Sequence, residues 1–221
     1  MGTAGSIRSP MGTALRRDHG VVVPVRAFRL GNTRLAAGLD DDTRTALARE
    51  LATRVADAAG DAPLVVVSSA EEVVEWAGAR GATVVADPGS LDAGARVGVA
   101  AVAGLGLARA VVAHADLPLA TDFEAVVHDA GTPVAVLVPC HHDDGTPVLS
   151  VPTAAASTFA FAYGPGSFRR HVASARAAGL AVRVVRDHRL AADIDTVDDL
   201  VALRRIDPTL PAAPDRIEVH P

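Results

Sequence analysis

Lysine is absent from this sequence of 221 residues, so arginine supplies all 21 basic side chains. This absence excludes enzymes that form a Schiff base on lysine and nucleotide-binding proteins that need the lysine of a Walker A loop. Cysteine occurs once, as Cys140. A single cysteine forms no internal disulfide, so the fold does not depend on an oxidising compartment. Because reactive thiols need a specific activating environment, Cys140 is expected to be inert.

Aromatic residues and long apolar runs are also scarce. Aromatic residues make up 3% of the chain and hydrophobic residues 49%, so the core has to be built from Ala, Val and Leu. No apolar run reaches the ~18 residues of a membrane-spanning helix, and residues 1–18 lack the apolar stretch of a signal peptide. The net charge of −5 argues against a nucleic-acid-binding protein, which would carry a basic stripe. We therefore expect a cytoplasmic protein without nucleic-acid or membrane partners.

Short apolar runs alternate along the chain with Ala-rich segments of helical spacing. The runs are mostly apolar throughout, as in strands covered on both faces of a parallel sheet. They lie at 21–25, 64–67, 83–86, 110–113, 134–138 and 181–185. The helical segments lie at 43–59, 71–79, 93–105, 122–130, 167–178 and 196–205. The alternation predicts an α/β fold with a doubly wound, mostly parallel sheet.

The domain organisation follows from the same pattern. We expect a single domain over residues 19–206, where the apolar periodicity lies. Residues 1–18 are expected to form a flexible N-terminal tail. Residues 207–221 contain four prolines and are expected to form a loose C-terminal arm.

The loop after the first apolar run is rich in arginine. Arg26, Arg29 and Arg34 lie within nine residues and are interrupted by Gly31. A guanidinium group matches the oxygens of a phosphate, and ligands bind beyond the carboxyl ends of the strands in this type of sheet. The loop could therefore bind a polyphosphate. The alternative is an ordinary solvated loop.

Carboxylates follow two later apolar runs. Asp116 comes directly after the run at 110–113, and Asp193 and Asp195 lie one residue apart near the start of the last helical segment. Mg²⁺ binds one or two protein carboxylates and completes its coordination with water and substrate phosphates. These side chains could meet at one metal ion if the strand ends are neighbours. The alternative is that Asp116 and Asp195, or Thr196, cap the helices that follow.

Two further segments carry polar groups. The turn Gly164-Pro165-Gly166-Ser167 opens a helix, whose first amides and Ser167 hydroxyl could bind an anion. The alternative is that Ser167 is a simple N-cap. The segment His141-His142-Asp143-Asp144 lacks the ligand spacing of a zinc site, so a turn that precedes a strand is the favoured interpretation.

In this order, the segments resemble the guanylyltransferase family of coenzyme F420 biosynthesis. The resemblance covers Val21 to Arg205, and its most specific part is the run Phe-Ala-Tyr-Gly-Pro-Gly-Ser-Phe at 161–168. The stretch at 178–187 and the motif Asp193-Ile194-Asp195-Thr196 complete it. The resemblance implies a Rossmann-like fold of the nucleotide-diphospho-sugar transferase type (GT-A-like), shared with molybdopterin guanylyltransferases.

The resemblance also implies an activity and a set of residues. Members transfer GMP from GTP to the phosphate of a small phospho-acid, phosphoenolpyruvate or 2-phospho-L-lactate, and release pyrophosphate. The implied Mg²⁺ ligands are Asp116, Asp193 and Asp195, and the implied phospho-acid contacts are Thr146, Gly164 and Ser167. The implied GTP contacts are Arg26, Asn32, Arg34 and Asp92, of which Arg26 and Arg34 act in catalysis with Asp116. A transferase that continues the assembly of the coenzyme is an implied partner.

This sequence departs from the family pattern at several positions. Arg26 and Asn32 stand where the family usually has two lysines, and Asp92 stands where it usually has asparagine. Where the family typically has a Gly-Thr-Gly-Thr run, this sequence reads Asp143-Asp144-Gly145-Thr146-Pro147. The alternatives are therefore a non-catalytic GTP-binding homologue, a nucleotidyltransferase for another acceptor, or a glycosyltransferase that uses Asp193 and Asp195 as an Asp-x-Asp motif.

Overall fold

A computed structural model of the chain describes residues 18–127, 132–141 and 143–212. The strands are β1 (His19–Pro24), β2 (Leu64–Val67), β3 (Thr83–Val85), β4 (Arg109–Ala113), β5 (Val134–Val138), β6 (Val148–Pro152) and β7 (Ala181–Val184). The helices are α1 (Asp41–Ala58), α2 (Glu71–Gly78), α3 (Leu91–Gly104), α4 (Ser167–Ala177) and α5 (Val197–Arg204). Most of the N-terminal tail and of the C-terminal arm expected from the sequence lies outside the described residues.

The strands form one sheet in the order β3-β2-β1-β4-β6-β5-β7. The pairs among β1, β2, β3 and β4 and the pair of β5 with β7 are parallel, whereas β6 is antiparallel to both β4 and β5. The expected doubly wound, mostly parallel α/β fold is therefore confirmed. The sequence indicated only that a strand follows the turn at 141–147, because Ser150 interrupts its apolar run.

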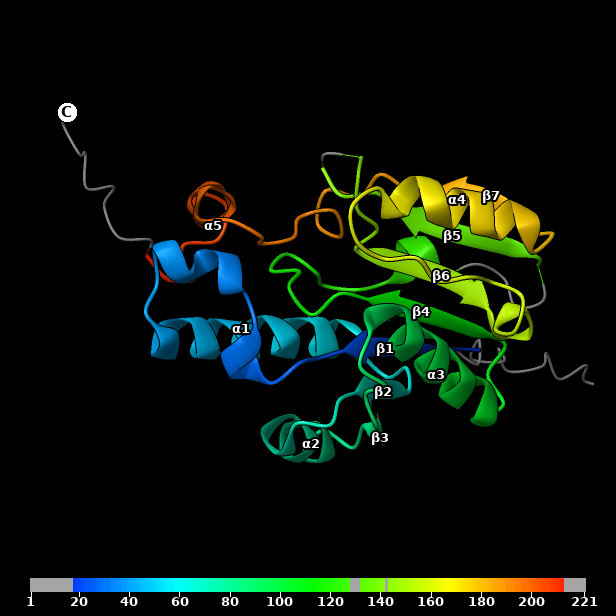
Figure 1. Cartoon of the computed structure of the whole chain (residues 1–221), viewed down its shortest axis with the longest axis horizontal. Helices are drawn as coiled ribbons and strands as arrows, with labels where there is room; N and C mark the ends of the chain where they lie inside the picture. The colour runs from blue at the N-terminus through cyan, green and yellow to red at the C-terminus, as the bar shows by residue number, and fades with distance from the viewer. Residues whose placement is uncertain (1–17, 128–131, 142, 213–221) are drawn as a thin grey trace, which may run out of the picture.

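Helices cover both faces of the sheet (Figure 1). Successive side chains of β1 point to opposite faces, so Val21 and Val23 belong to the core on the side of α1 and α2, whereas Val22 belongs to the core beneath α3 and α4. Burial on both faces explains why the strands are apolar throughout. No helix of the described residues is long and apolar enough to cross a membrane.

A third apolar cluster lies beyond the sheet and joins α5 to the first half of α1. It contains Leu47 and Leu51 of α1, Leu200 of α5, and Leu210. The Arg54 guanidinium forms an ion pair with Asp207, and Leu210 is 2% exposed. The segment that was expected to be a loose arm is thus anchored at its start, because a buried leucine and an ion pair join it to α1.

The helix expected at 122–130 is not found in its described part. Instead, Glu124–Val126 forms a single 3-10 turn (η3), and the backbone is already extended at Val127. The Asp122 carboxylate accepts the N–H of Glu124, which closes a tight turn that competes with a longer helix. Residues 128–130 of the expected helix lie outside the described residues.

The carboxyl ends of the parallel strands face the left side of Figure 1, and the N-terminus of α4 lies on the same side. Two 3-10 helices, η1 (Phe28–Leu30) and η2 (Thr33–Ala37), follow β1 there. This is the edge of the sheet at which the sequence analysis expects a ligand.

Candidate active site

The segments that carry the predicted metal-binding carboxylates lie side by side. The N–H of Ile194 donates to the carbonyl oxygen of Asp116 at 3.2 Å, so Asp193 and Asp195 flank the residue that pairs with Asp116. Burial, together with the negative charge of Asp195, raises the pKa of Asp116 to about 7. The Oδ1 atom of Asp116 is buried and has no hydrogen-bond partner among the described residues. A cation at this edge would remove both penalties.

Asp193 and Asp195 have other partners in this structure. Burial raises the pKa of Asp193, and the charge of Asp116 adds to this effect. Asp193 lies 3.7 Å from the His141 imidazole, and Asp195 forms an exposed ion pair of 2.8 Å with Arg34. Accordingly, no group of three or more His, Cys, Asp or Glu side chains in the described ranges is arranged to bind a metal. Asp116 with one neighbouring carboxylate still fits Mg²⁺, which needs only one or two of them.

The arginine-rich loop forms η1 and η2, which lead from β1 to α1. Arg26 and Arg34 are both exposed. Asn32 has a left-handed backbone with φ of 49°, a conformation that asparagine adopts more readily than most residues. Its carbonyl oxygen accepts the N–H of Leu35 and starts η2, and its side-chain nitrogen is buried without a partner among the described residues. The left-handed backbone therefore suits an asparagine at this position.

The three predicted phospho-acid contacts lie together at the N-terminus of α4. The Ser167 hydroxyl donates to Thr146 Oγ1 across 3.4 Å, and the N–H of Ser167 donates to the carbonyl oxygen of Gly164 at 2.9 Å. Thr146 is 0% and Ser167 2% exposed, whereas Gly164 is exposed. Gly164 has φ of +94°, which a residue with a side chain rarely adopts. We call residues 162–167 the acceptor corner.

Polar side chains from other segments hold the acceptor corner in place. Asp92 accepts the N–H of Tyr163 at 2.6 Å, and Asp144 accepts the N–H of Gly166 at 2.8 Å. The Arg170 guanidinium donates to the carbonyl oxygens of residues 162–165. Asp92, predicted to bind the nucleotide, thus ties the start of α3 to this corner.

Ring contacts of Tyr163 with His114 and His171 join the two halves of the site. The Tyr163 ring lies 5.4 Å from the ring of His114 and 4.7 Å from that of His171. His114 lies two residues before Asp116, and burial lowers its pKa while the charges of Asp193 and Asp195 oppose this effect. The acceptor corner and the carboxylates therefore belong to one edge. No local sequence pattern could have revealed these contacts between distant segments.

His171 is buried, and both of its ring nitrogens are engaged. The N–H of Ala162 donates to His171 Nε2 at 2.9 Å, and Nδ1 lies 3.1 Å from Thr146 Oγ1. A nitrogen that accepts a backbone N–H carries no proton, so the neutral ring has its hydrogen on Nδ1 and donates it to Thr146. Burial lowers the pKa of His171 to about 4, which agrees with this neutral form.

The loop at 139–147 forms a turn, as expected. The N–H of Asp143 donates to the carbonyl oxygen of Cys140, and the N–H of Cys140 donates to that of Gly145. Cys140 itself is buried. His142 lies outside the described residues. His141 contacts Asp193 and also lies 3.9 Å from Asp199, so this turn borders the carboxylates.

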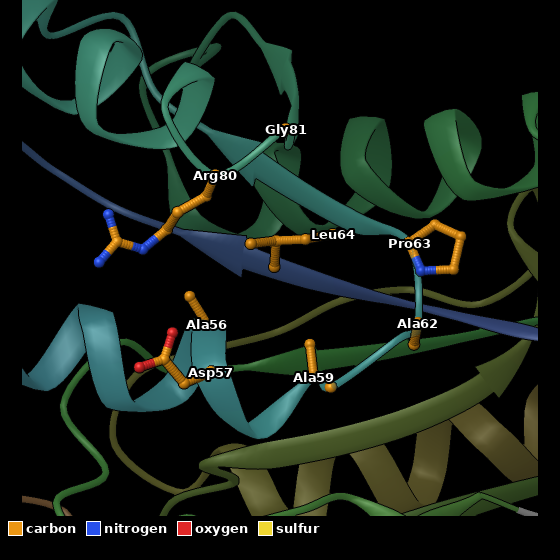
Figure 2. Close-up of a pocket in the computed structure, with 9 residues that line it drawn as sticks. Ala56, Asp57, Ala59, Ala62, Pro63, Leu64, Arg80 and Gly81 are labelled. Carbon is orange, nitrogen blue, oxygen red and sulfur yellow. The ribbon is translucent and has the colours of Figure 1, made fainter.

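Two surface hollows lie away from this chemistry. Figure 2 shows one between the end of α1 and the start of β2, with Asp57 and Arg80 on its rim. Because Pro63 and Leu64 enter β2 there, it lies at the amino end of a strand, opposite the ligand-binding edge. The other is lined by Arg29 and by Glu71, Glu72 and Glu75, whose three carboxylates would repel a polyphosphate.

Comparisons with known proteins agree with the resemblance to guanylyltransferases. Residues 19–204 match the family model described as "Guanylyl transferase CofC like". A phosphoenolpyruvate guanylyltransferase of Sphaerobacter thermophilus is 37% identical over 189 residues, which cover 82% of this chain and 90% of that protein. A 3-phospho-D-glycerate guanylyltransferase of Phenylobacterium zucineum is 33% identical over 195 residues, which cover 83% and 88% of the two chains.

A solved structure has the same fold. It is described as a putative nucleotide-diphospho-sugar transferase of Desulfovibrio desulfuricans and is 17% identical to this chain, with a TM-score of 0.65. The similarity covers 86% of this chain and 87% of the other. At this identity the match shows the fold alone, and that fold is the type expected from the sequence.

Proposed function

This chain belongs to the CofC-like guanylyl transferase family and is a nucleotidyltransferase, and from this premise we propose that it transfers GMP from GTP to phosphoenolpyruvate in coenzyme F420 biosynthesis. The observation that carries the proposal is the family match over residues 19–204, which includes every candidate site residue. The contact between the Asp116 and Asp193–Asp195 segments supports it. We further propose a single catalytic domain that begins near residue 19 and acts in the cytoplasm.

In the proposed reaction, a phosphate oxygen of the phospho-acid attacks the α-phosphorus of GTP. A new P–O bond forms there, the bond between the α-phosphorus and the oxygen bridging to the β-phosphorus breaks, and pyrophosphate leaves. The attacking phosphate is already ionised near neutral pH, so no general base is needed. The protein contributes positioning and charge neutralisation.

Two groups of side chains would neutralise the negative charge of the phosphates. Asp116, with Asp193 or Asp195, would hold Mg²⁺, which neutralises phosphate charge when it is bound. Arg26 and Arg34 would bind the β- and γ-phosphates and the leaving pyrophosphate. Arg34 is already paired with Asp195. Binding of GTP and a cation would therefore exchange this ion pair for contacts to phosphate and metal.

The acceptor corner would bind the phospho-acid. Thr146, Gly164 and Ser167 would surround its phosphate, and the Gly164 backbone allows close approach because no side chain intervenes. Asn32 and Asp92 would lie beside the nucleotide. Asp92 already accepts the N–H of Tyr163 at 2.6 Å, so it would link the nucleotide side of the site to the acceptor side.

The acceptor is phosphoenolpyruvate in this proposal because the 37% identical relative is named for it. The relative named for 3-phospho-D-glycerate is only slightly more distant, at 33% identity. 2-Phospho-L-lactate is the further acceptor that the family resemblance suggests. All three are small phosphorylated carboxylic acids, but phosphoenolpyruvate and 2-phospho-L-lactate carry the phosphate on the carbon next to the carboxylate, whereas 3-phospho-D-glycerate carries it one carbon further away.

The test is pyrophosphate release by the purified chain with GTP and each of the three phospho-acids in turn. We expect release with phosphoenolpyruvate, and we expect it to stop when EDTA removes divalent cations and to return when Mg²⁺ is added in excess. Parallel assays with ATP, CTP and UTP test the preference for guanine.

Other outcomes contradict the proposal in different ways. GTP binding in calorimetry without pyrophosphate release from any acceptor would show a non-catalytic GTP-binding homologue. Release of a nucleoside diphosphate from a sugar nucleotide would show a glycosyltransferase. Turnover with only 3-phospho-D-glycerate or 2-phospho-L-lactate would support the guanylyltransferase activity and show that phosphoenolpyruvate is not the acceptor. A downstream transferase as partner is tested by whether it consumes the product in a coupled assay.

A further inference from the structure

Three buried polar atoms at the candidate site lack a hydrogen-bond partner among the described residues. They are Asp116 Oδ1, His114 Nε2 and the Tyr163 hydroxyl oxygen. A buried polar group without a partner costs free energy, so native proteins contain few of them. The proposed metal accounts for Asp116. His114 Nε2 and the Tyr163 hydroxyl have no role in the proposed function.

Tyr163 is held in place by three separate elements. Its N–H is bound by Asp92 at the start of α3, and its ring packs edge-on against His171 of α4 with an interplanar angle of 73°. On a third side, its ring lies 5.4 Å from that of His114, which follows β4. The ring is therefore fixed where the acceptor corner meets His114, two residues before Asp116. Its hydroxyl stays protonated, because burial and the nearby Asp92 charge raise the pKa of Tyr163.

The Arg170 side chain is already engaged by the backbone of the corner. The Arg170 guanidinium donates through Nε, Nη1 and Nη2 to the carbonyl oxygens of residues 162–165. Its donors are thus used to hold the backbone of the corner. The phosphate of the acceptor has Thr146, Gly164 and Ser167 in the proposed function, but its carboxylate has no donor assigned.

We propose that Tyr163 is a further substrate-binding residue, whose hydroxyl donates a hydrogen bond to the carboxylate of the phospho-acid. The inference rests on the proposed function and specifies how that site distinguishes a phospho-acid from a simple phosphate ester. A neutral phenol suits this role because it donates a hydrogen bond to the carboxylate but has no positive charge that would attract any phosphate. The hydroxyl has no partner among the described residues, and it gains one when the acceptor binds.

The first test is Tyr163→Phe, which removes one oxygen and keeps the ring contacts. Steady-state pyrophosphate release should show a KM for phosphoenolpyruvate raised about tenfold, as expected for one lost hydrogen bond to a charged group, with the KM for GTP within about twofold of wild type. The melting temperature should stay equal or rise, because a buried hydroxyl without a partner is removed. A purely structural tyrosine would instead lose stability and leave the two KM values unchanged.

The matched control is Ser157→Ala, which removes an exposed hydroxyl from the segment that leads into the corner. It should leave both KM values and the melting temperature unchanged. An unchanged KM for phosphoenolpyruvate in Tyr163→Phe, or a rise in the KM for GTP alone, would overturn the inference.

The second test does not depend on turnover. Tyr163 is the one tyrosine of the chain, so protein labelled with ¹³C at the tyrosine Cζ gives a single NMR signal. Phosphoenolpyruvate with Mg²⁺ should shift this signal to saturation, whereas ethyl phosphate, which lacks the carboxylate, should not. Equal shifts with both compounds, or no shift with either, would contradict the proposed contact.

The two proposals fail separately. If the wild-type chain releases no pyrophosphate with any phospho-acid, the proposed function fails, and the NMR titration alone then decides whether a phospho-acid contacts Tyr163. If turnover is normal but the Tyr163 signal does not move, the guanylyltransferase stands and the role of Tyr163 is wrong.

Discussion

At the carboxyl edge of the sheet, single residues carry buried charged or polar atoms that have no partner among the described residues. Asp116 has a pKa near 7 because it is buried beside Asp195, and its Oδ1 has no partner in the described part of the chain. Such a group destabilises the free protein and is useful only when a ligand approaches it. The same reasoning applies to Tyr163.

Asp116→Asn should lower kcat by at least about 100-fold, because it weakens the proposed metal site, whereas Ser167→Ala should cost less, about tenfold. The asparagine has the same shape, so the melting temperature should not fall. Pyrophosphate release at saturating GTP and phosphoenolpyruvate measures both effects. Near-normal turnover of Asp116→Asn would contradict this ranking.

His171 should make stability depend on pH. Its pKa is about 4 when folded, chiefly because it is buried; the charge of Asp92 opposes this shift, and the charges of Arg170 and His114 add to it. The unfolded value is about 6.5, so the unfolded chain binds the proton more tightly. The contribution is fully present above pH 6.5 and is lost as pH falls toward 4. It amounts to about 2 kcal/mol between pH 7 and pH 5.

Urea unfolding at pH 7 and pH 5 measures this loss. His171→Gln cannot titrate there, so its free energy of unfolding should fall by about 2 kcal/mol less than that of wild type over the same interval. If the variant does not fold, an NMR titration of the wild-type imidazole gives the pKa directly. A value near 6.5 would contradict the buried neutral ring.

At the scale of elements, the packing of α3 on the sheet controls where Asp92 lies. α3 is capped by Ser90, whose hydroxyl accepts the N–H of Ala93, and its glycines let it approach β1 closely. A Cβ on Gly98 would lie 2.2 Å from Cγ1 of Val22. Because Asp92 holds Tyr163, this close approach also sets the position of the acceptor corner.

Gly98→Ala should therefore destabilise the protein by about 1–3 kcal/mol, because overpacking outweighs the better helix propensity of alanine. Gly104→Ala in the same helix is the control, since a Cβ there meets nothing within 4 Å. It should leave stability unchanged or raise it by up to about 1 kcal/mol. Urea denaturation of both variants measures their free energies of unfolding. Equal changes in the two variants would rule out the close contact of Gly98 with Val22 as the cause.

At the scale of the whole molecule, the C-terminal residues belong to the folded unit at least as far as Leu210. Leu210 packs into the cluster that joins α1, η2 and α5, and Ile194 of the carboxylate segment belongs to the same cluster. This cluster supports the segment that positions Asp193 and Asp195 from the side opposite the sheet.

Leu210→Ala should cost about 2–4 kcal/mol of stability, because it leaves a cavity in this cluster. Ile206→Ala is the matched control, since Ile206 is 65% exposed, and it should change stability by no more than about 0.5 kcal/mol. Thermal unfolding followed by circular dichroism measures both. A negligible effect of Leu210→Ala would mean that the domain ends at residue 206, as the sequence suggested.

The sequence by itself determined the alternation of strands and helices, because apolar periodicity is a local property that buried strands such as Leu64–Val67 and amphipathic helices such as Asp41–Ala58 show directly. It also placed Asp116 directly after a strand and Asp193–Asp195 just ahead of the last helix, and it carried the resemblance that the family match confirmed. The helix expected at 122–130 is only a 3-10 turn in its described part, where the Asp122 carboxylate accepts the N–H of Glu124.

Only the tertiary structure decided which distant residues meet. The insertion of antiparallel β6 between β4 and β5 depends on how the whole sheet assembles, and no local pattern encodes it. The pairs Arg34–Asp195, Asp92–Tyr163 and Thr146–His171 likewise form because the strand order brings far-separated loops to one edge. Burial and hydrogen bonding at that edge are properties of the folded chain, and they gave Tyr163 and His171 the roles proposed here.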